Sequence, residues 1–272
     1  MHDAQSTLTL GRQYLKAIEQ SEEPSIVEAL KEIAPDLARM AISFAYGEIY
    51  SRPALDLRQR QLVTVAALAA MGGADPQLRF HIAGALNVGC SPREIVELMI
   101  HLVVYAGFPA ALNGVSAARV VFNEKHIEVA PVTVRPSATR YEDGVAGLRA
   151  IDGAVGEGVI ESLNDIAPDL GRFIVEFAFG DVYSRSGIDL VVRELITVAA
   201  LAAMGSATPQ LKVHMHGFLN VGGTREQLVE AVTQIAAYAG FPRAINAALS
   251  AKEVLHHRDQ DRVDAGKQRD PV

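Results

Sequence analysis

The chain carries nearly the same sequence pattern twice, and the second copy follows the first at an offset of 133 residues. The segment IAPDL begins at Ile33 and again at Ile166, and the segment TVAALAAMG begins at Thr64 and again at Thr197. The copies align without a gap over residues 11–122 and 144–255. Solenoid repeats have periods of about 20–50 residues. A period this much longer therefore indicates a duplicated domain.

The alignment divides the chain into four parts. Residues 1–122 are predicted to form the first repeat, and residues 144–256 are predicted to form the second. The segment 123–143 contains two prolines and several β-branched residues, which favours an extended linker. The final segment, 257–272, is strongly polar, and we expect it to be disordered.

Hydrophobic periodicity predicts an all-α fold with five or six helices in each repeat. Residues 57–72 are almost wholly apolar after a basic start and end at glycine, which is typical of a central buried helix. Asp75-Pro76 and Ser91-Pro92 are typical helix starts. The expected helices of the first repeat cover residues 34–51, 57–72, 75–89, 91–107 and 108–122, and the second repeat has their equivalents.

The composition excludes several classes of protein. The net charge is −7 with acids and bases interspersed, so the chain offers no basic stripe to nucleic acid. The single cysteine, Cys90, excludes an intramolecular disulfide and a CxxC pair. The first residues lack the pattern of a signal peptide, and the apolar runs are too short to span a bilayer. We therefore expect a soluble, cytoplasmic protein with no nucleic-acid or membrane partner.

His214 and His216 lie two residues apart in an expected helix. At this spacing their side chains point about 200° apart, so they cannot chelate one metal ion. In the first repeat His81 matches His214, whereas Ala83 replaces His216. We therefore predict no metal site here and interpret His216 as a surface or interface residue. His214 and His81 are candidates for either a structural or a catalytic role.

The two copies differ at the start of the central helix, where Glu194 of the second repeat matches Gln61 of the first. Burial in an apolar helix raises the pKa of an unpaired glutamate, which suits a group that must gain and lose a proton. Gln61 keeps the shape and loses that ability. The alternative is that Glu194 faces solvent in the first turn and complements the helix dipole.

Arginines and tyrosines recur at equivalent positions of the two repeats. A buried arginine needs an anionic partner, either a carboxylate of the protein or one of a substrate. A tyrosine in the repeated YAGFP segment either donates a hydrogen bond to a ligand or closes the core. The residues concerned are Arg60 and Arg193, Arg52 and Arg185, and Tyr105 and Tyr238.

This pattern resembles the carboxymuconolactone decarboxylase family of the alkylhydroperoxidase-D-like group. The matching segments of the second repeat are IAPDLGRFIVEFAFGDVYSR, RELITVAALAAMG, PQLKVHMHGFLNVGGTREQLVEAV and YAGFP, and each has a counterpart in the first. The resemblance implies two tandem alkylhydroperoxidase-D-like helical domains that form a pseudo-dimer. It also implies a homotrimer of such duplicated chains, which is a pseudo-hexamer.

The resemblance further implies the type of chemistry. The peroxidase branch of the group uses a glutamate on the central helix, a CxxC and a histidine as a proton relay. Glu194 and His214 match the ends of that relay, but Ala207 and Gln210 stand near the positions of the two cysteines. Peroxide reduction by a dithiol is therefore excluded. The resemblance implies a cofactor-free decarboxylase that converts 4-carboxymuconolactone to the β-ketoadipate enol-lactone in aromatic-compound degradation.

The candidate residues have expected roles in this reaction. His214 is expected to donate a proton to carbon after CO2 is lost, Glu194 to orient or recharge its imidazole, and His81 to be the counterpart in the first repeat. The expected ligands of the substrate carboxylates and lactone oxygen are Arg193, Arg185, Tyr238, Arg60 and Tyr105. Gln61 predicts that the first site is impaired, altered or purely structural. Two alternatives are a family member recruited to another decarboxylation, proton transfer or rearrangement in biosynthesis, and a non-catalytic ligand-binding or assembly protein.

Overall fold

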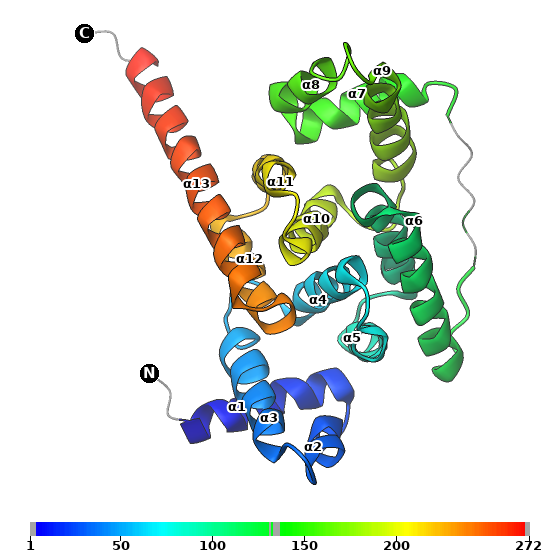
Figure 1. Ribbon diagram of the computed structural model, residues 1–272, viewed down its shortest axis with the longest axis vertical. Coiled ribbons are helices and arrows are strands. Elements are labelled where there is room, and N and C mark those ends of the chain that lie inside the picture. The colour runs from blue at the N-terminus through cyan, green and yellow to red at the C-terminus, as the bar shows by residue number, and fades with distance from the viewer. Residues whose placement is uncertain (1–3, 131, 133–136, 270–272) are drawn as a thin grey trace.

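A computed structural model describes residues 4–130, 132 and 137–269 of the chain (Figure 1). These residues form helices joined by short loops and contain no strand, so the predicted all-α fold is confirmed. The first repeat forms α1 (Ala4–Glu19), α2 (Ser25–Leu30), α3 (Pro35–Met40), η1 (Ala41–Ile49), α4 (Leu57–Met71), α5 (Asp75–Asn87) and α6 (Pro92–Glu124). The second forms α7 (Arg140–Ile151), α8 (Gly153–Glu161), α9 (Pro168–Phe173), η2 (Ile174–Tyr183), α10 (Leu190–Met204), α11 (Thr208–Asn220), α12 (Arg225–Ala239) and α13 (Phe241–Arg269).

The observed helices follow the predicted ones closely from α3 to α6 and from α9 to α13. The expected helix over 34–51 is α3 continued by η1, whose hydrogen bonding is of the wider π type. The break predicted within the repeated YAGFP segment is also present. Gly107 interrupts α6 with a φ of +80°, and Gly240 separates α12 from α13 with a φ of +86°. Both conformations favour glycine, because a side chain strains a backbone with positive φ.

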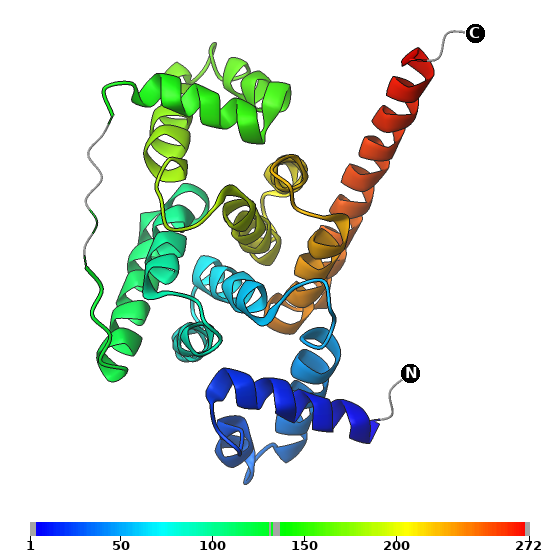
Figure 2. The ribbon, with the colours of Figure 1, turned by 180° about the vertical axis from the view of Figure 1, so that it is seen from behind.

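The central helices α4 and α10 lie side by side and form the middle of the molecule (Figures 1 and 2). Small side chains such as Ala66, Ala67, Ala199 and Ala200 are fully buried there. The later helices cross between the repeats: α12 packs against α4, and α6 packs against α10 and η2. The two repeats therefore share one hydrophobic core in the manner of a dimer.

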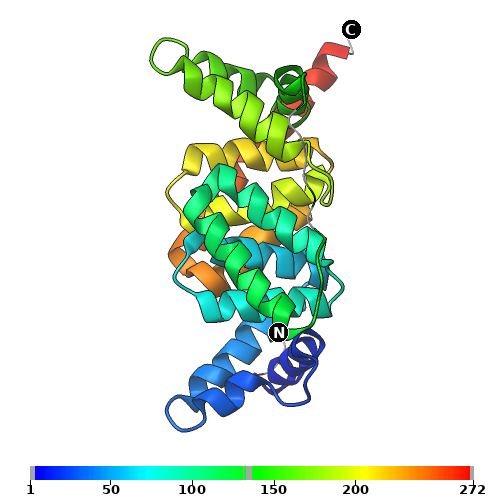
Figure 3. The same cartoon turned by 90° about the vertical axis from the view of Figure 1, so that its right-hand side faces the viewer.

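The helices α1 and α7 are absent from the sequence-based prediction, and repeated glycines hold them in place. A Cβ on Gly11 would lie 2.1 Å from the Ile42 carbonyl oxygen of η1, and a Cβ on Gly144 would lie 2.1 Å from the Val175 oxygen of η2. Each N-terminal helix thus packs directly on the backbone of a π-helix. This contact, together with that between α7 and α11, sets the end of α7 beside the centre of the second repeat. The N-terminal helices of the two repeats lie at opposite ends of the molecule (Figure 3).

Two predicted boundaries need correction. α6 extends to Glu124 and α7 begins at Arg140, so the connection is shorter than the predicted linker 123–143, and residues 131 and 133–136 lie outside the described part. The prediction of a disordered tail from 257 is wrong for residues 257–269, because α13 continues to Arg269. Polar contacts anchor this helix: Arg225 pairs with Asp259 at 2.5 Å, and Arg258 donates to the Asn220 side chain at 2.8 Å.

The helix α6 is long and apolar enough to cross a membrane by length and composition alone, contrary to the expectation that every apolar run is too short. Its apolar side chains, however, help to build the core. Leu98, Met99 and Leu102 are fully buried, and Gly107 divides the helix. The first half of α6 therefore lies in the interior of the helical domain, while Phe108 and Leu112 of its second half are exposed.

Candidate active site

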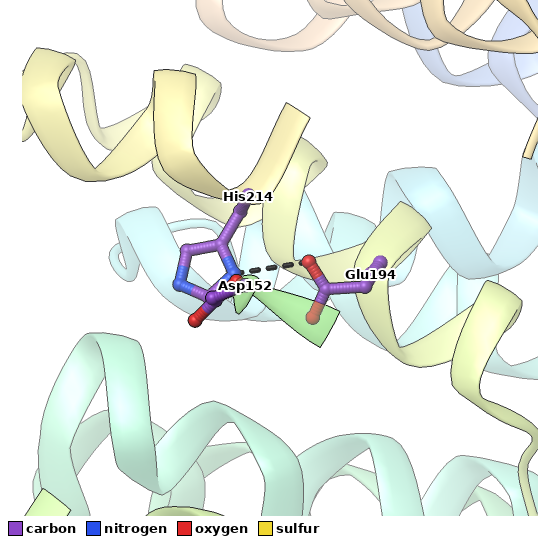
Figure 4. A group of neighbouring side chains, drawn as sticks. All are labelled: Asp152, Glu194 and His214. Atoms are coloured by element: carbon purple, nitrogen blue, oxygen red, sulfur yellow. Dashed lines mark hydrogen bonds and ion pairs between the residues drawn. The ribbon is translucent and has the colours of Figure 1, made fainter. Parts of the chain in front are cut away.

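Glu194 and His214 form a buried hydrogen-bonded pair in the second repeat. Glu194 lies in the first turns of α10, and His214 lies in the middle of α11. The His214 Nδ1 atom is 2.9 Å from the Glu194 Oε2 atom (Figure 4). Glu194 is fully buried, so the alternative in which it faces solvent does not apply. The structure thus brings together the two residues that the sequence nominates as a relay.

Two tyrosines continue the hydrogen-bond network from Glu194. The Tyr183 hydroxyl of η2 donates to the other carboxylate oxygen of Glu194, Oε1, at 2.5 Å. The hydroxyl of Tyr105 lies 2.5 Å from that of Tyr183, and the Tyr105 ring packs edge-on against the imidazole of His214. Because Tyr183 gives its proton to Glu194, Tyr105 is left to donate to Tyr183. Both oxygens of Glu194 are therefore satisfied by named partners.

A cavity of about 280 Å³ borders His214. Its walls come from α6, α7, α8, η2 and α11, and they are largely apolar, with Leu148, Ile160 and Phe179 among them. The polar residues that line it are Tyr105, Asp152, Gln210 and His214. Since Nδ1 of His214 is bonded to Glu194, Nε2 is the ring nitrogen left for a molecule in the cavity.

The charge state of His214 is set by its carboxylate neighbours. Burial by itself lowers the pKa of His214, but the Glu194 carboxylate, the hydrogen bond with it and the nearby Asp152 carboxylate outweigh burial and raise this pKa above its ordinary value. A raised pKa favours the protonated form of this imidazole, and a protonated imidazole at the wall of an apolar cavity is a suitable general acid.

The equivalent cluster in the first repeat has a different character. His81 Nδ1 lies 2.9 Å from the amide oxygen of Gln61, which brings no negative charge. Burial therefore lowers the pKa of His81 to about 3, and its imidazole is neutral. Phe80 packs edge-on against His81, where the second repeat has the smaller cavity-lining Val213. This cluster supplies neither a charged imidazole nor the same open wall.

The tyrosines are exchanged between the repeats. Tyr105 belongs to α6 of the first repeat but packs against His214 of the second, whereas Tyr238 belongs to α12 of the second repeat but packs against His81 of the first. Tyr238 also shares a 2.8 Å hydrogen bond with Tyr50. The expectation that Tyr238 acts alongside His214 is therefore not supported, because the crossed packing of α6 and α12 carries each tyrosine to the opposite site.

The candidate arginines bind carboxylates of the protein. Arg185 makes two hydrogen bonds of 2.9 Å to Glu97, and Arg193 lies 3.6 Å from the same carboxylate. Arg60 is likewise paired with Glu230 at 2.9 Å. None of these arginines is among the residues that line the cavity beside His214. Of the two anionic partners considered for a buried arginine, the structure therefore shows a carboxylate of the protein. Glu97 lies in α6 and Glu230 in α12, so these ion pairs connect each of the two helices to the opposite repeat.

Asp152, Glu194 and His214 are the residues that could hold a metal ion, since they offer ligand atoms that lie within 4.8 Å of one another. Both Glu194 oxygens and the His214 Nδ1 atom already take part in hydrogen bonds with protein groups. A metal would have to replace the bond between Glu194 and His214. The group is therefore better described as a proton relay than as a metal centre.

Sequence reasoning missed Asp152 and Tyr183 and assigned no role to the recurrent Glu97, although the duplication carried a signal for each. Asp152 matches Glu19 at the repeat offset, Tyr183 matches Tyr50, and Glu97 matches Glu230. The sequence does not show that α7 ends beside the site, nor that α6 and α12 each pack against the opposite repeat.

Paired substitutions of the exchanged tyrosines test which cluster is active. Tyr105→Phe removes a hydroxyl from the Glu194 network, and we expect it to lower turnover about 10-fold, by about 1.4 kcal/mol in the activation barrier. Tyr238→Phe makes the same change beside His81 and is expected to leave turnover within twofold of the unchanged protein. Steady-state kinetics of both variants provide the measurement. A larger loss in Tyr238→Phe would instead place the active cluster in the first repeat.

Comparisons with known proteins identify the family of the chain. The model of the carboxymuconolactone decarboxylase family matches residues 35–120 and 168–253, once in each repeat. The 4-carboxymuconolactone decarboxylase of Acinetobacter baylyi is 38% identical over 108 residues, which cover 40% of this chain and 78% of that protein. The nitrosuccinic acid decarboxylase npaB of Metarhizium robertsii is 33% identical over 81 residues, which cover 30% of this chain and 56% of that protein.

A solved structure shares the fold along almost the whole chain. It is a crystal structure described as a candidate gamma-carboxymuconolactone decarboxylase subunit from Burkholderia xenovorans. The TM-score is 0.58 at 23% identity, and the match covers 93% of this chain and 98% of the other. With two family matches that together span more than half of its length, the chain belongs to the carboxymuconolactone decarboxylase family, as a tandem duplication of the family's domain.

Proposed function

We propose that the protein is a cytoplasmic, cofactor-free decarboxylase of a small carboxylated lactone, with 4-carboxymuconolactone as the first substrate to test. The observation that carries the proposal is the Glu194–His214 pair at the wall of an apolar cavity. The likeness to a 4-carboxymuconolactone decarboxylase supports the choice of substrate. The product would be the β-ketoadipate enol-lactone, which belongs to aromatic-compound degradation.

In this reaction the carbon–carbon bond to one carboxylate breaks, and its electron pair passes into the conjugated lactone as a dienolate. CO2 leaves, and the carbanionic carbon must then receive a proton. The imidazolium of His214 supplies it, because the carboxylate of Glu194 keeps that ring protonated (2.9 Å). The neutral imidazole that results regains its proton from solvent, so one proton is consumed for each CO2 released.

Tyr183 and Tyr105 hold Glu194 in position for this step. Their hydroxyl groups fix one carboxylate oxygen of Glu194 and leave the other aimed at His214. The arginine pairs with Glu97 and Glu230 act farther out, where they hold the repeats together. We therefore assign Arg185, Arg193 and Arg60 to positioning the helices that carry the site.

A second candidate function is the decarboxylation of another small dicarboxylate. The similarity to a nitrosuccinic acid decarboxylase favours it, because loss of CO2 beside a nitro group also leaves a delocalised anion that needs a proton at carbon. The same His214 would supply that proton. Competition between the two compounds in one assay would show which of them the cavity prefers.

The direct test is to incubate the purified protein with 4-carboxymuconolactone and to follow CO2 release together with the appearance of the enol-lactone. We expect both products at equal rates without added metal or coenzyme. Nitrosuccinate is assayed in parallel. Release of CO2 from neither compound would contradict the proposed function.

We also propose that three duplicated chains assemble into a homotrimer with six copies of the domain. Large apolar side chains are exposed at equivalent positions of the two repeats, which provides matching surfaces for contacts between chains. These residues are Leu37, Met40, Phe108 and Leu112 in the first repeat and Leu170, Phe173, Phe241 and Ile245 in the second.

Light scattering coupled to gel filtration tests this assembly. We expect a mass of about three times the chain mass of 29.1 kDa. The double variant Leu112→Glu with Ile245→Glu should run at the mass of a single chain, because it places charge on an apolar contact of each repeat. A single-chain mass for the unchanged protein would overturn the proposed trimer.

A further inference from the structure

Asp152 is a buried carboxyl group that lies in the site and has no assigned partner. It caps the C-terminal end of α7, and it is only 9% exposed. Its Oδ1 atom has no hydrogen-bond partner among the residues that the structure describes. A buried carboxyl oxygen without a partner carries a free-energy cost, which a ligand in the adjoining cavity can remove.

The groups around Asp152 come from three other elements. Glu194 reaches it from α10 and His214 from α11 (Figure 4). Tyr105 of α6 is also near enough to interact with it electrostatically. The carboxyl groups of Asp152 and Glu194 meet at Gly217, where an added Cβ would lie 3.1 Å from Asp152 Oδ1 and 2.8 Å from Glu194 Oε2. Glycine at this position thus makes room for two carboxyl groups side by side.

Two neighbouring carboxyl groups in an apolar site do not both ionise easily. Tyr183 and His214 both bond to Glu194, whereas the Asp152 Oδ1 atom has no partner in the described part of the chain. Burial raises the pKa of Asp152 to about 6; His214 opposes the rise, and Glu194 adds to it. An anionic ligand in the cavity would favour the neutral form of Asp152 still more.

We propose that Asp152 is a second catalytic residue of this site, which in its protonated form donates a hydrogen bond to an anionic oxygen of the bound ligand. The role rests on the proposed decarboxylation, in which negative charge grows on the lactone oxygen as CO2 leaves. Asp152 keeps its proton throughout, while His214 transfers its own to carbon. The ligand class is a small molecule with a carboxylate or enolate oxygen, which the cavity binds through Asp152, His214 and Gln210.

Two substitutions at Asp152 separate this role from others. Asp152→Ala removes the donor, and we expect it to lower turnover of 4-carboxymuconolactone about 100-fold, the scale for loss of one hydrogen bond to a developing oxyanion. Asp152→Asn keeps a donor of the same shape and should stay within about 10-fold of the unchanged protein. Glu19→Gln is the matched control in the first repeat and should leave turnover unchanged.

The dependence of kcat/KM on pH distinguishes this role from a purely structural one, which would leave the pH profile unchanged. In the unchanged protein kcat/KM should fall as the pH rises through about 6, because the free Asp152 then loses the proton that it donates. An amide side chain cannot ionise in this range, so this limb should be absent in the Asp152→Asn variant. Circular dichroism should show the same helical content in all variants.

A binding experiment keeps this inference separate from the proposed function. The probe is the saturated lactone with the same two carboxylates, which cannot form the dienolate. Calorimetry in buffers of different ionisation enthalpy should show proton uptake on binding to the unchanged protein and less uptake by the Asp152→Asn variant. Uptake equal in both, or Asp152→Asn as slow as Asp152→Ala, would overturn the role of Asp152 while leaving the decarboxylase proposal intact. If the unchanged protein binds the probe but releases no CO2 from the lactone, the proposed reaction fails instead.

Discussion

The His214→Ala variant is expected to lose about 10²- to 10⁴-fold in turnover of the carboxylated lactone, the range that a general acid contributes. The reason is that His214 is the expected proton donor: it lines the cavity, and its Nδ1 atom lies 2.9 Å from the Glu194 Oε2 atom. Without it, the dienolate can take a proton only from water, which the apolar walls restrict. Steady-state kinetics with the lactone measure the loss.

The neighbouring histidine is the matched control for this substitution. His216 lies on the same helix but outside the residues that line the cavity. His216→Ala should therefore keep turnover within twofold, and both variants should keep the helical spectrum. Unimpaired turnover in His214→Ala would remove His214 from the mechanism.

The Glu194→Gln variant should have the second-largest effect, a loss of about 100-fold in turnover. It gives the second repeat the amide that the first repeat already has at Gln61. We expect the pKa of His214 to fall below its ordinary value, as burial lowers that of His81 to about 3. The imidazole would then be neutral at the working pH and have no proton to deliver. Turnover against pH and the imidazole resonances in NMR spectra measure these changes.

The same substitution should alter the dependence of stability on pH. The raised pKa of His214 means that its charge stabilises the fold below a pH of about 6.5 and that this contribution is lost as the pH rises through the folded-state pKa. In Glu194→Gln a lowered pKa reverses the sign, so protonation favours unfolding. Thermal unfolding should therefore show a greater loss of stability at a pH of about 5.5 than at a pH of about 8.

The reciprocal variant Gln61→Glu is the control for Glu194→Gln. It should raise the pKa of His81 without creating a second active cluster, because Phe80 stands where the cavity of the second repeat has Val213. We expect turnover to stay within twofold. A doubling or more of the activity would show that the first repeat is inactive only because Gln61 lacks the negative charge of Glu194.

Much of the fold followed from local patterns. The duplication, the buried helices α4 and α10 and the breaks at Gly107 and Gly240 are all visible in the sequence, because periodicity and glycine punctuation act over a few residues. The helices α1 and α7 were not predicted, since the glycines that hold them act through contacts with η1 and η2. The polar end of α13 was misjudged because its partners, Arg225 and Asn220, lie in other segments.

For the site, the sequence by itself determined which residue types are present. It nominated Glu194 and His214, and it distinguished the second repeat from the first through Gln61. Only the tertiary structure decided which groups meet. It set Asp152 beside His214, bound Arg193 and Arg185 to Glu97, and exchanged Tyr105 and Tyr238 between the repeats. The physical reason is that these contacts join helices from different parts of the chain, and their partners are chosen by the packing of α6 and α12 across the shared core.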